Sequence, residues 1–124
     1  MKPTAGELDI LQILWQNNGE MTVKEINEEI NKVKETGYTT TLKLMQIMYE
    51  KGLLTREQNG RSHLYRASIK EDDTKSSLLK NFIDSTFNGS AASLVMQALG
   101  NHKTTKEELE MIREYLDNIE KGKK

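Results

Sequence analysis

Apolar side chains recur every three or four positions along the first fifty residues, a spacing that predicts short amphipathic helices. Three such stripes can be traced, and a glycine follows each of them, at position 19, 37 or 52. The stripes consist of Leu8, Leu11, Leu14 and Trp15; of Val23, Ile26, Ile30 and Val33; and of Thr41, Leu44, Met45 and Met48. The pattern therefore predicts three helices, the third running from about residue 39 to residue 51.

Ser/Thr-x-x-Glu sequences indicate where the helices begin. In such a capping box the hydroxyl accepts a hydrogen bond from a free backbone amide, and the Glu carboxylate accepts one from the amide of the cap residue. Four of these sequences precede apolar helical runs, so we expect a helix to begin after each. The pairs are Thr4 with Glu7, Thr22 with Glu25, Ser68 with Glu71, and either Thr104 with Glu107 or Thr105 with Glu108.

The periodicity changes after Gly52, where two short runs have the alternating pattern of β-strands. They cover residues 53–58 and 61–66 and flank the dipeptide Asn59-Gly60. Asn-Gly between two β-prone runs is a strong hairpin signal, because both central residues of a type I′ turn require a positive φ. Three helices followed by a two-stranded hairpin describe a winged helix-turn-helix domain, which we expect to span residues 1–70.

From residue 71 to residue 124 the chain returns to helical spacing. Its three amphipathic runs have apolar faces but too little surface, within about 55 residues, to cover one another. A second copy of the chain would cover them, and a two-fold dimer is the commonest assembly of this kind. We therefore expect a helical dimerisation domain over residues 71–124, and a homodimer. The expected dimer contacts are Leu78, Phe82, Phe87, Leu94, Val95, Leu109, Ile112 and Leu116. The predicted fold class is mainly α with a small antiparallel β wing.

The composition, with 35% hydrophobic and 30% charged residues, is that of a globular protein with a lean core. The chain contains no cysteine, which excludes disulfides, thiolate metal sites and cysteine nucleophiles. No apolar run approaches the roughly 20 residues that span a bilayer, and Glu7, Asp9 and Gln12 interrupt any apolar leader. We expect a cytoplasmic protein with no membrane insertion, no metal and no cofactor.

Positive charge is concentrated in one short segment, although the whole chain has a net charge of −1. Residues 43–70 contain six Lys and Arg against two Glu, a net charge of +4. Residues 1–42 contain four Lys against seven acids, and residues 71–124 contain eight Lys and Arg against ten acids. A polyanion should therefore bind at residues 43–70, which form the predicted third helix and hairpin.

The third predicted helix is the recognition helix of the helix-turn-helix, so its exposed face should enter the major groove of duplex DNA. The positions opposite its buried stripe are Thr39, Thr40, Lys43, Gln46, Ile47 and Glu50. We expect DNA contacts from all of these except Glu50, and also from Lys51. Lys43 can donate to guanine, Gln46 can pair with adenine, and Ile47 can touch a thymine methyl group. The alternative is that these side chains are simply solvated.

The predicted hairpin adds further cationic side chains. Arg61 at its tip, with Arg56 and His63 on its strands, should contact phosphate or the minor groove. Such contacts position a protein on the duplex without specifying sequence. For His63 an ordinary hydrogen bond within the strand is an equal alternative, and for Arg66 we expect a salt bridge.

No motif supports an enzyme. His63 and His102 are isolated, and the chain lacks a zinc-protease helix motif, a phosphate-binding loop, a nucleophile elbow and a dinucleotide fingerprint. Two interpretations compete with DNA binding. The winged helix could hold another protein instead of DNA, or the chain could be an enzyme subunit or adaptor whose helical tail docks elsewhere.

Four stretches carry a resemblance to a known family. They are "ELDILQILW", "MTVKEINEEIN", "GYTTTLKLMQIMYEKGLLTREQNGRSHLYRA" and "FNGSAASLVMQAL". Together they resemble the penicillinase-repressor (BlaI/MecI) family of winged-helix repressors over most of the chain. The resemblance implies a homodimeric transcriptional repressor with interlocked C-terminal helices, each wing domain binding one half of a palindromic operator.

The resemblance also implies how repression ends. In this family, repressors of antibiotic-resistance genes are released when a membrane-embedded sensor metalloprotease leads to their cleavage in the tail, at an Asn-Phe bond in a stretch resembling "SLVLNF". The matching stretch here is "SLVMQA", which places Gln97 and Ala98 at the scissile position. The sequence departs from the family at this bond, and again at Ile47, where members often have a basic residue. The cysteine-rich metal site of the copper-responsive branch is absent.

Overall fold

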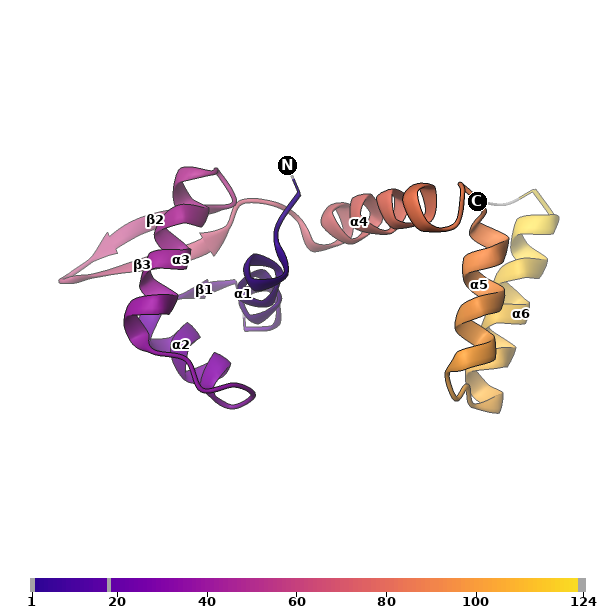
Figure 1. The fold of residues 1–124 in the computed structure, drawn as a ribbon, viewed down its shortest axis with the longest axis horizontal. Helices are drawn as coiled ribbons and strands as arrows, with labels where there is room; N and C mark the ends of the chain where they lie inside the picture. Colours follow the sequence, from indigo (N-terminus) through magenta and orange to yellow (C-terminus); the bar gives the residue numbers. More distant parts are fainter. Residues whose placement is uncertain (1, 18, 123–124) are drawn as a thin grey trace. The chain divides into compact units, whose positions relative to one another are not determined.

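The computed structural model describes residues 2–17 and 19–122, and the chain divides into two compact units, Met1–Leu79 and Lys80–Lys124. Figure 1 shows the helices and strands of both units. In the first unit three helices pack on a three-stranded antiparallel sheet, whereas the second unit is helical. The predicted fold class, mainly α with a small β wing, is confirmed. None of the helices in the described ranges is long and apolar enough to cross a membrane.

Local capping begins the first two helices as the sequence predicts. α1 spans Ala5–Gln16 and begins after Thr4, whose Oγ1 accepts from the amide of Glu7 at 3.2 Å while Glu7 Oε1 accepts from the amide of Thr4 at 2.9 Å. α2 spans Val23–Asn31 and begins with the same reciprocal pair at Thr22 and Glu25. Both predicted capping boxes are confirmed.

α3 spans Tyr38–Glu50 and ends in a glycine cap. Gly52 has a φ of +86°, which is costly for other residues. Its amide donates to the carbonyl of Tyr49, and the amide of Leu53 donates to the carbonyl of Met48 at 2.9 Å. These two bonds satisfy the last carbonyls of the helix and turn the chain directly into the sheet.

The sheet has the order β1-β3-β2 and includes a strand that the sequence does not predict. β2 spans Leu54–Asn59 and β3 spans Ser62–Ala67, which are the two strands of the expected hairpin. The additional strand, β1, is the dipeptide Glu20–Met21, which pairs with the far edge of β3. Two residues are too short to show an alternating pattern, so periodicity could not reveal this strand.

The turn of the hairpin differs from the predicted type. Asn59 pairs with Ser62, so the central residues are Gly60 and Arg61, not Asn59 and Gly60. Gly60 has a φ of +65°, and Asn88 is the one non-glycine residue with a positive φ in the described chain. A glycine with positive φ followed by a residue with negative φ is the pattern of a type II′ turn. The prediction of a type I′ turn at Asn59-Gly60 is therefore wrong.

One hydrophobic core stabilises the first unit. Its buried side chains are Ile10, Leu11, Leu14, Met21, Val23, Ile26, Met45, Met48, Leu53, Leu54 and Tyr65. They come from all three helices and all three strands, so the wing and the helices share one core. Trp15 packs at the edge of this core, and its indole Nε1 donates to the carbonyl of Ile69 at 3.3 Å.

Two details of the sequence prediction are corrected. Val33 is 92% exposed because α2 ends at Asn31, before the fourth position of the predicted stripe. Ser68 does not cap the fourth helix, since its hydroxyl donates to the carbonyl of Gly52 and the helix begins only at Glu71.

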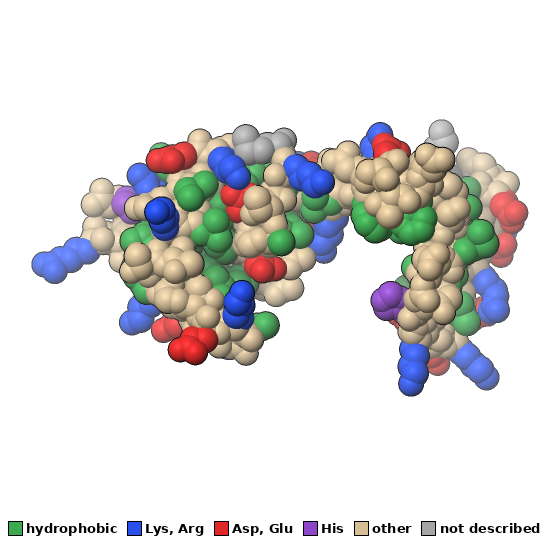
Figure 2. Space-filling view, in the orientation of Figure 1, with side chains coloured by type: hydrophobic (Ala, Val, Ile, Leu, Met, Phe, Trp, Pro, Cys, Tyr) green, Lys and Arg blue, Asp and Glu red, His purple; other side chains and the backbone are tan. Residues whose placement is uncertain are grey.

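From residue 71 onward the chain consists of helices whose apolar residues are at most half-buried. α4 spans Glu71–Thr86 and α5 spans Ala91–Asn101. α6 spans Lys106–Glu120 and begins at a capping box of Thr105 with Glu108, one of the two predicted alternatives. Among residues 80–122, every residue is partly or fully exposed, and Figure 2 shows hydrophobic side chains on the surface of these helices. The large exposed apolar side chains here are Phe82, Val95, Met96, Leu99, Met111, Tyr115, Leu116 and Ile119.

Candidate nucleic-acid interface

The N-terminus of α3 leaves backbone amides without protein partners. Gly37 precedes the helix, and no side chain caps it. Thr39 and Thr40 lie exposed in this first turn. Free amides and the positive end of the helix dipole together favour an anion such as phosphate.

One face of α3 is buried and the opposite face is open. Thr41, Met45 and Met48 are buried. The six positions that the sequence places outward, Thr39, Thr40, Lys43, Gln46, Ile47 and Glu50, are all exposed. The predicted orientation of the helix is therefore confirmed, while the DNA contacts of these residues stay a prediction.

Two asparagines fix the turn between α2 and α3. Asn27 Nδ2 donates to Thr41 Oγ1 at 2.8 Å and to the carbonyl of Thr36 at 3.0 Å. Asn31 Oδ1 accepts from the amide of Thr36 at 2.9 Å. These bonds join the C-terminal half of α2 to the start of α3 and so set the angle of the exposed helix. No local sequence pattern identifies the partners of Asn27 and Asn31.

Lys51, at the C-terminal end of α3, is held by a buried carboxylate. Its Nζ lies 2.6 Å from Glu7 Oε2, and the Glu7 side chain is only 2% exposed. Burial alone would raise the pKa of Glu7, but the hydrogen bonds from Lys51 and from the amide of Thr4 outweigh it and place that pKa below its ordinary value. The ammonium group of Lys51, which the sequence predicts to contact DNA, therefore pairs with Glu7 instead. Lys51 is not part of the proposed DNA-binding surface.

Other cations of the basic segment differ in whether they form an ion pair. Arg66 pairs with Glu20 across the β1–β3 edge, with Nη2 2.6 Å from Oε2, which confirms the predicted salt bridge. Lys43 on α3 and Arg61 in the hairpin turn are exposed, and neither has an ion-pair partner among residues 2–17 and 19–122. Figure 2 shows a cationic side chain reaching beyond the end of the hairpin. Lys43 and Arg61 can therefore contact a polyanion without first breaking an ion pair.

Arg56 of β2 contacts two tyrosines. Its guanidinium carbon lies 4.0 Å from the ring centroid of Tyr49, in the last turn of α3, and its Nη1 donates to Tyr65 Oη at 3.4 Å. The bond to Tyr65 raises the pKa of Arg56 above its ordinary value. His63 is half-buried with its ring edge-on to Tyr65, the centroids 6.2 Å apart. The sequence did not identify Tyr49 as a partner, because the contact depends on where the strand returns beside the helix.

A hollow of about 550 Å³ lies beside the recognition helix. It is formed by α1, the segment joining α2 to α3, and the first turns of α3. Its charged lining residues are Asp9, Glu29, Lys32 and Lys34, and Lys32 pairs with Glu29 at 2.8 Å. With two acids and two lysines the hollow has no net charge. It therefore attracts the DNA backbone less strongly than the exposed face of α3 does.

The expected dimer residues lie on the helices of the tail, except Phe87, which directly follows α4, and all of them are incompletely covered. Phe82, Val95 and Leu116 are between 45% and 53% exposed. The others, Leu78, Phe87, Leu94, Leu109 and Ile112, are half-buried. Phe82 and Phe87 meet edge to face with centroids 5.7 Å apart.

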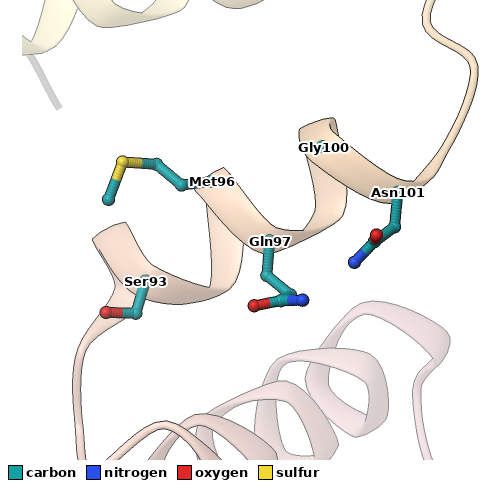
Figure 3. Close-up of a pocket in the computed structure, with 5 residues that line it drawn as sticks. All are labelled: Ser93, Met96, Gln97, Gly100 and Asn101. Carbon is teal, nitrogen blue, oxygen red and sulfur yellow. The ribbon is translucent and has the colours of Figure 1, made fainter.

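The expected scissile residues, Gln97 and Ala98, lie exposed in the middle of α5. A shallow hollow of about 380 Å³ follows one face of this helix and includes Gln97. Figure 3 shows its lining residues, Ser93, Met96, Gln97, Gly100 and Asn101, with the side chains of Gln97 and Asn101 on the same side of the ribbon. None of these five residues is charged.

Comparison with protein families and curated sequences places this geometry among repressors. The sequence profile described as "Penicillinase repressor" matches residues 3–118. The chain is 31% identical to the penicillinase repressor of Staphylococcus aureus, over 93% of this chain and 90% of the relative. It is 26% identical to the methicillin resistance regulatory protein MecI of Staphylococcus aureus (strain N315), over 92% of each. The penicillinase repressor of Bacillus licheniformis is 24% identical, over 95% of this chain and 91% of the relative.

A solved structure shows the same fold in the first unit. The solution structure of the DNA-binding domain of the repressor BlaI aligns with a TM-score of 0.51 and 23% sequence identity. It covers 59% of this chain and 93% of that domain. The likeness is one of fold, and it agrees with the winged helix described above.

Proposed function

The chain belongs to the penicillinase repressor family, and from this we propose that it represses transcription by binding double-stranded DNA with α3 and the β2–β3 hairpin, the wing. The family is one of repressors, not of enzymes. One observation carries the proposal. The exposed face of α3 and the hairpin turn present Lys43 and Arg61, which have no ion-pair partners in the described chain.

Five exposed side chains have a role in this proposal. Thr39 and Thr40 bind a backbone phosphate at the helix N-terminus. Lys43 donates to guanine and Gln46 pairs with adenine in the major groove. Arg61 contacts phosphate or the minor groove beside it, which fixes the position of the domain on the duplex.

The second unit makes the repressor a homodimer in this proposal. Its residues from 80 to 122 are all at least partly exposed, and they include large apolar side chains such as Val95 and Leu116. Exposed apolar surface of this extent favours association, and a two-fold pair is the commonest result. Two such wing domains would bind the halves of a palindromic operator about one helical turn apart, roughly 10 base pairs. Bound there, the dimer would block access to the promoter in the cytoplasm.

In this proposal a sensor metalloprotease leads to cleavage between Gln97 and Ala98, which releases the repressor from DNA. This step requires a structural change. This bond lies within the helical backbone of α5. Proteolysis within a folded element proceeds through local opening. Cleavage at Gln97 therefore requires at least part of α5 to unfold first, and weakened pairing of the second units would expose it.

The DNA-binding proposal is tested by measuring affinity for duplexes selected in vitro, over a range of salt concentrations. Neutralised phosphates make the logarithm of the binding constant fall linearly with the logarithm of salt concentration. Arg61→Ala should reduce the magnitude of that slope by about one. Arg113→Ala is the matched control, because Arg113 lies in the second unit and pairs with Glu110. Binding that is absent, or independent of salt, would instead favour a winged helix that binds protein.

The homodimer is tested by light scattering on the eluting full chain. We expect a mass near twice the 14.2 kDa of one chain. Leu116→Asp places a charge on the exposed apolar face of α6 and should shift the population to monomers. A wild-type chain that stays monomeric at high concentration would exclude the dimer while leaving DNA binding by single wing domains open to measurement.

A further inference from the structure

The outer part of the wing has little hydrophobic packing to fix its direction. Along β2 only the first residue, Leu54, is buried, and the five that follow it to Asn59 are exposed. On β3 the buried residue is Tyr65. A two-stranded ribbon alone is marginally stable in water. The angle between this ribbon and α3 must therefore depend on a few side-chain contacts near its base.

Arg56 supplies such a contact from the face of the ribbon that also carries the buried Leu54 and Tyr65. Its guanidinium lies over Tyr49 of α3 at 4.0 Å from the ring centroid, and its Nη1 donates to Tyr65 Oη at 3.4 Å. Arg56 and Tyr65 are also direct cross-strand partners. One side chain of β2 thereby contacts both β3 and the last turn of α3. We call these three residues the Tyr49–Arg56–Tyr65 cluster.

We propose that Arg56 is a positioning residue, which holds the wing against the recognition helix so that Arg61 and the exposed face of α3 reach the same duplex together. This inference rests on the proposed DNA binding, and it assigns Arg56 a role within the protein in place of the phosphate contact expected from the sequence. A guanidinium that lies over one aromatic face and donates to the hydroxyl of a second tyrosine is constrained in both distance and direction. Loss of either ring contact leaves the hairpin free to move as a ribbon.

The two roles of Arg56 make opposite predictions for a neutral substitution at Tyr49. Tyr49→Leu removes the aromatic face without changing any charge. If Arg56 positions the wing, this variant should bind selected duplex DNA about tenfold more weakly, the equivalent of one such contact. Its salt slope should also fall in magnitude by about one, because Arg61 no longer stays at its phosphate.

Arg56→Met and the double variant complete the test in the full-length chain. Arg56→Met should resemble Tyr49→Leu, and the double variant should bind no worse than either, since both remove the same contact. Tyr49→Phe keeps the ring and should bind like the wild type. If Tyr49→Leu leaves affinity and salt slope unchanged while Arg56→Met lowers the slope, Arg56 contacts phosphate directly and the proposal is overturned.

A measurement without DNA separates this proposal from the proposed function. Amide hydrogen exchange reports how often the β2–β3 ladder opens. Tyr49→Leu should speed exchange about tenfold in β2 and β3 while leaving α1 and α2 unchanged. Unchanged exchange in the wing refutes the positioning role even if the protein binds DNA. Faster exchange in a protein that binds no DNA supports the positioning role and refutes the proposed function.

Discussion

The two units of the chain differ in how much of their apolar surface they bury. The first unit buries eleven hydrophobic side chains from six elements in one core. In the second unit the described residues bury none, although its helices carry leucines, phenylalanines and a valine at regular spacing. Burial of one large apolar side chain contributes about 1.5–3 kcal/mol. The first unit can therefore fold on its own core, whereas the second needs surface from elsewhere.

The capping of the helices shows that local sequence is not what separates the units. α1 and α2 in the first unit and α6 in the second all begin with a complete capping box. Caps decide where a helix starts, but a short helix in water gains most of its stability from packing. The difference between the units thus lies in tertiary and quaternary contacts. It can be measured by changing equivalent residues in each.

The largest contrast is expected between Leu14→Ala and Leu116→Ala. Leu14 is fully buried, so its truncation should lower the free energy of unfolding by about 2–5 kcal/mol, independently of protein concentration. Leu116 is 53% exposed in the single chain, so its truncation should act mainly by weakening association and should depend on concentration. Urea titrations at two protein concentrations measure both effects. A concentration-independent loss for Leu116→Ala would mean that the second unit has a core of its own.

Ion pairs should show the same contrast on a smaller scale. Lys51→Met leaves the buried Glu7 carboxylate without its partner. The cost should be roughly 2 kcal/mol, below the roughly 3–5 kcal/mol of a fully buried pair because Lys51 is 36% exposed. Lys80→Met removes the exposed pair with Asp84 in the second unit and should cost at most about 0.5 kcal/mol. Thermal denaturation of both variants compares them, and equal losses would contradict a structural role for Glu7.

Acid should destabilise the first unit through Glu7. Burial raises the pKa of this carboxyl, yet its hydrogen bonds with Lys51 and Thr4 lower it by more, so the folded value lies below the ordinary 4.5. The folded state therefore binds this proton less readily than the unfolded state. The stabilisation is complete above the ordinary pKa and is lost as pH falls from there through the folded value. Urea midpoints from pH 7 downward should fall less steeply in Glu7→Gln, and an unchanged pH profile would show that other groups dominate.

The smallest effect is expected from Gly100→Ala. Gly100 lies within α5, and a Cβ added there meets no atom within 4 Å. Alanine in a helix interior is about 0.5–1 kcal/mol more favourable than glycine. Gly100 lines the shallow hollow on α5, and none of the expected dimer residues lines it, so the variant should be more stable with unchanged association. Weaker association, measured by light scattering on dilution, would place the dimer contact on this face instead.

A feature could be predicted from the sequence when it depends on residues close together in the chain. The boxes at Thr4 and Thr22 need only four consecutive residues, and both were predicted correctly. The outward face of α3 follows from helical periodicity within one element. The order of elements in the winged helix, three helices and then a hairpin, is likewise predicted by the periodicity of successive segments.

The features that were missed depend on contacts between distant positions. β1 exists only because Glu20 and Met21 pair with β3, more than forty residues later. Lys51 was expected to contact DNA, but it pairs with Glu7, which lies 44 positions earlier in the chain. The turn type depends on which residues of the two strands face each other, and Asn59-Gly60 alone does not fix that register. The role of such a side chain can be predicted only when its contact partner and the register of the strands are known.

The hydrogen bond from Trp15 to Ile69 provides the chain with an internal optical reporter. Trp15 is the single tryptophan, and its indole is anchored to the backbone directly before α4. Its fluorescence therefore follows the folding of the first unit, whereas far-ultraviolet circular dichroism records the helices of both. On dilution or heating, a loss of ellipticity that precedes the change in emission would reveal the tail melting while the winged helix is still intact.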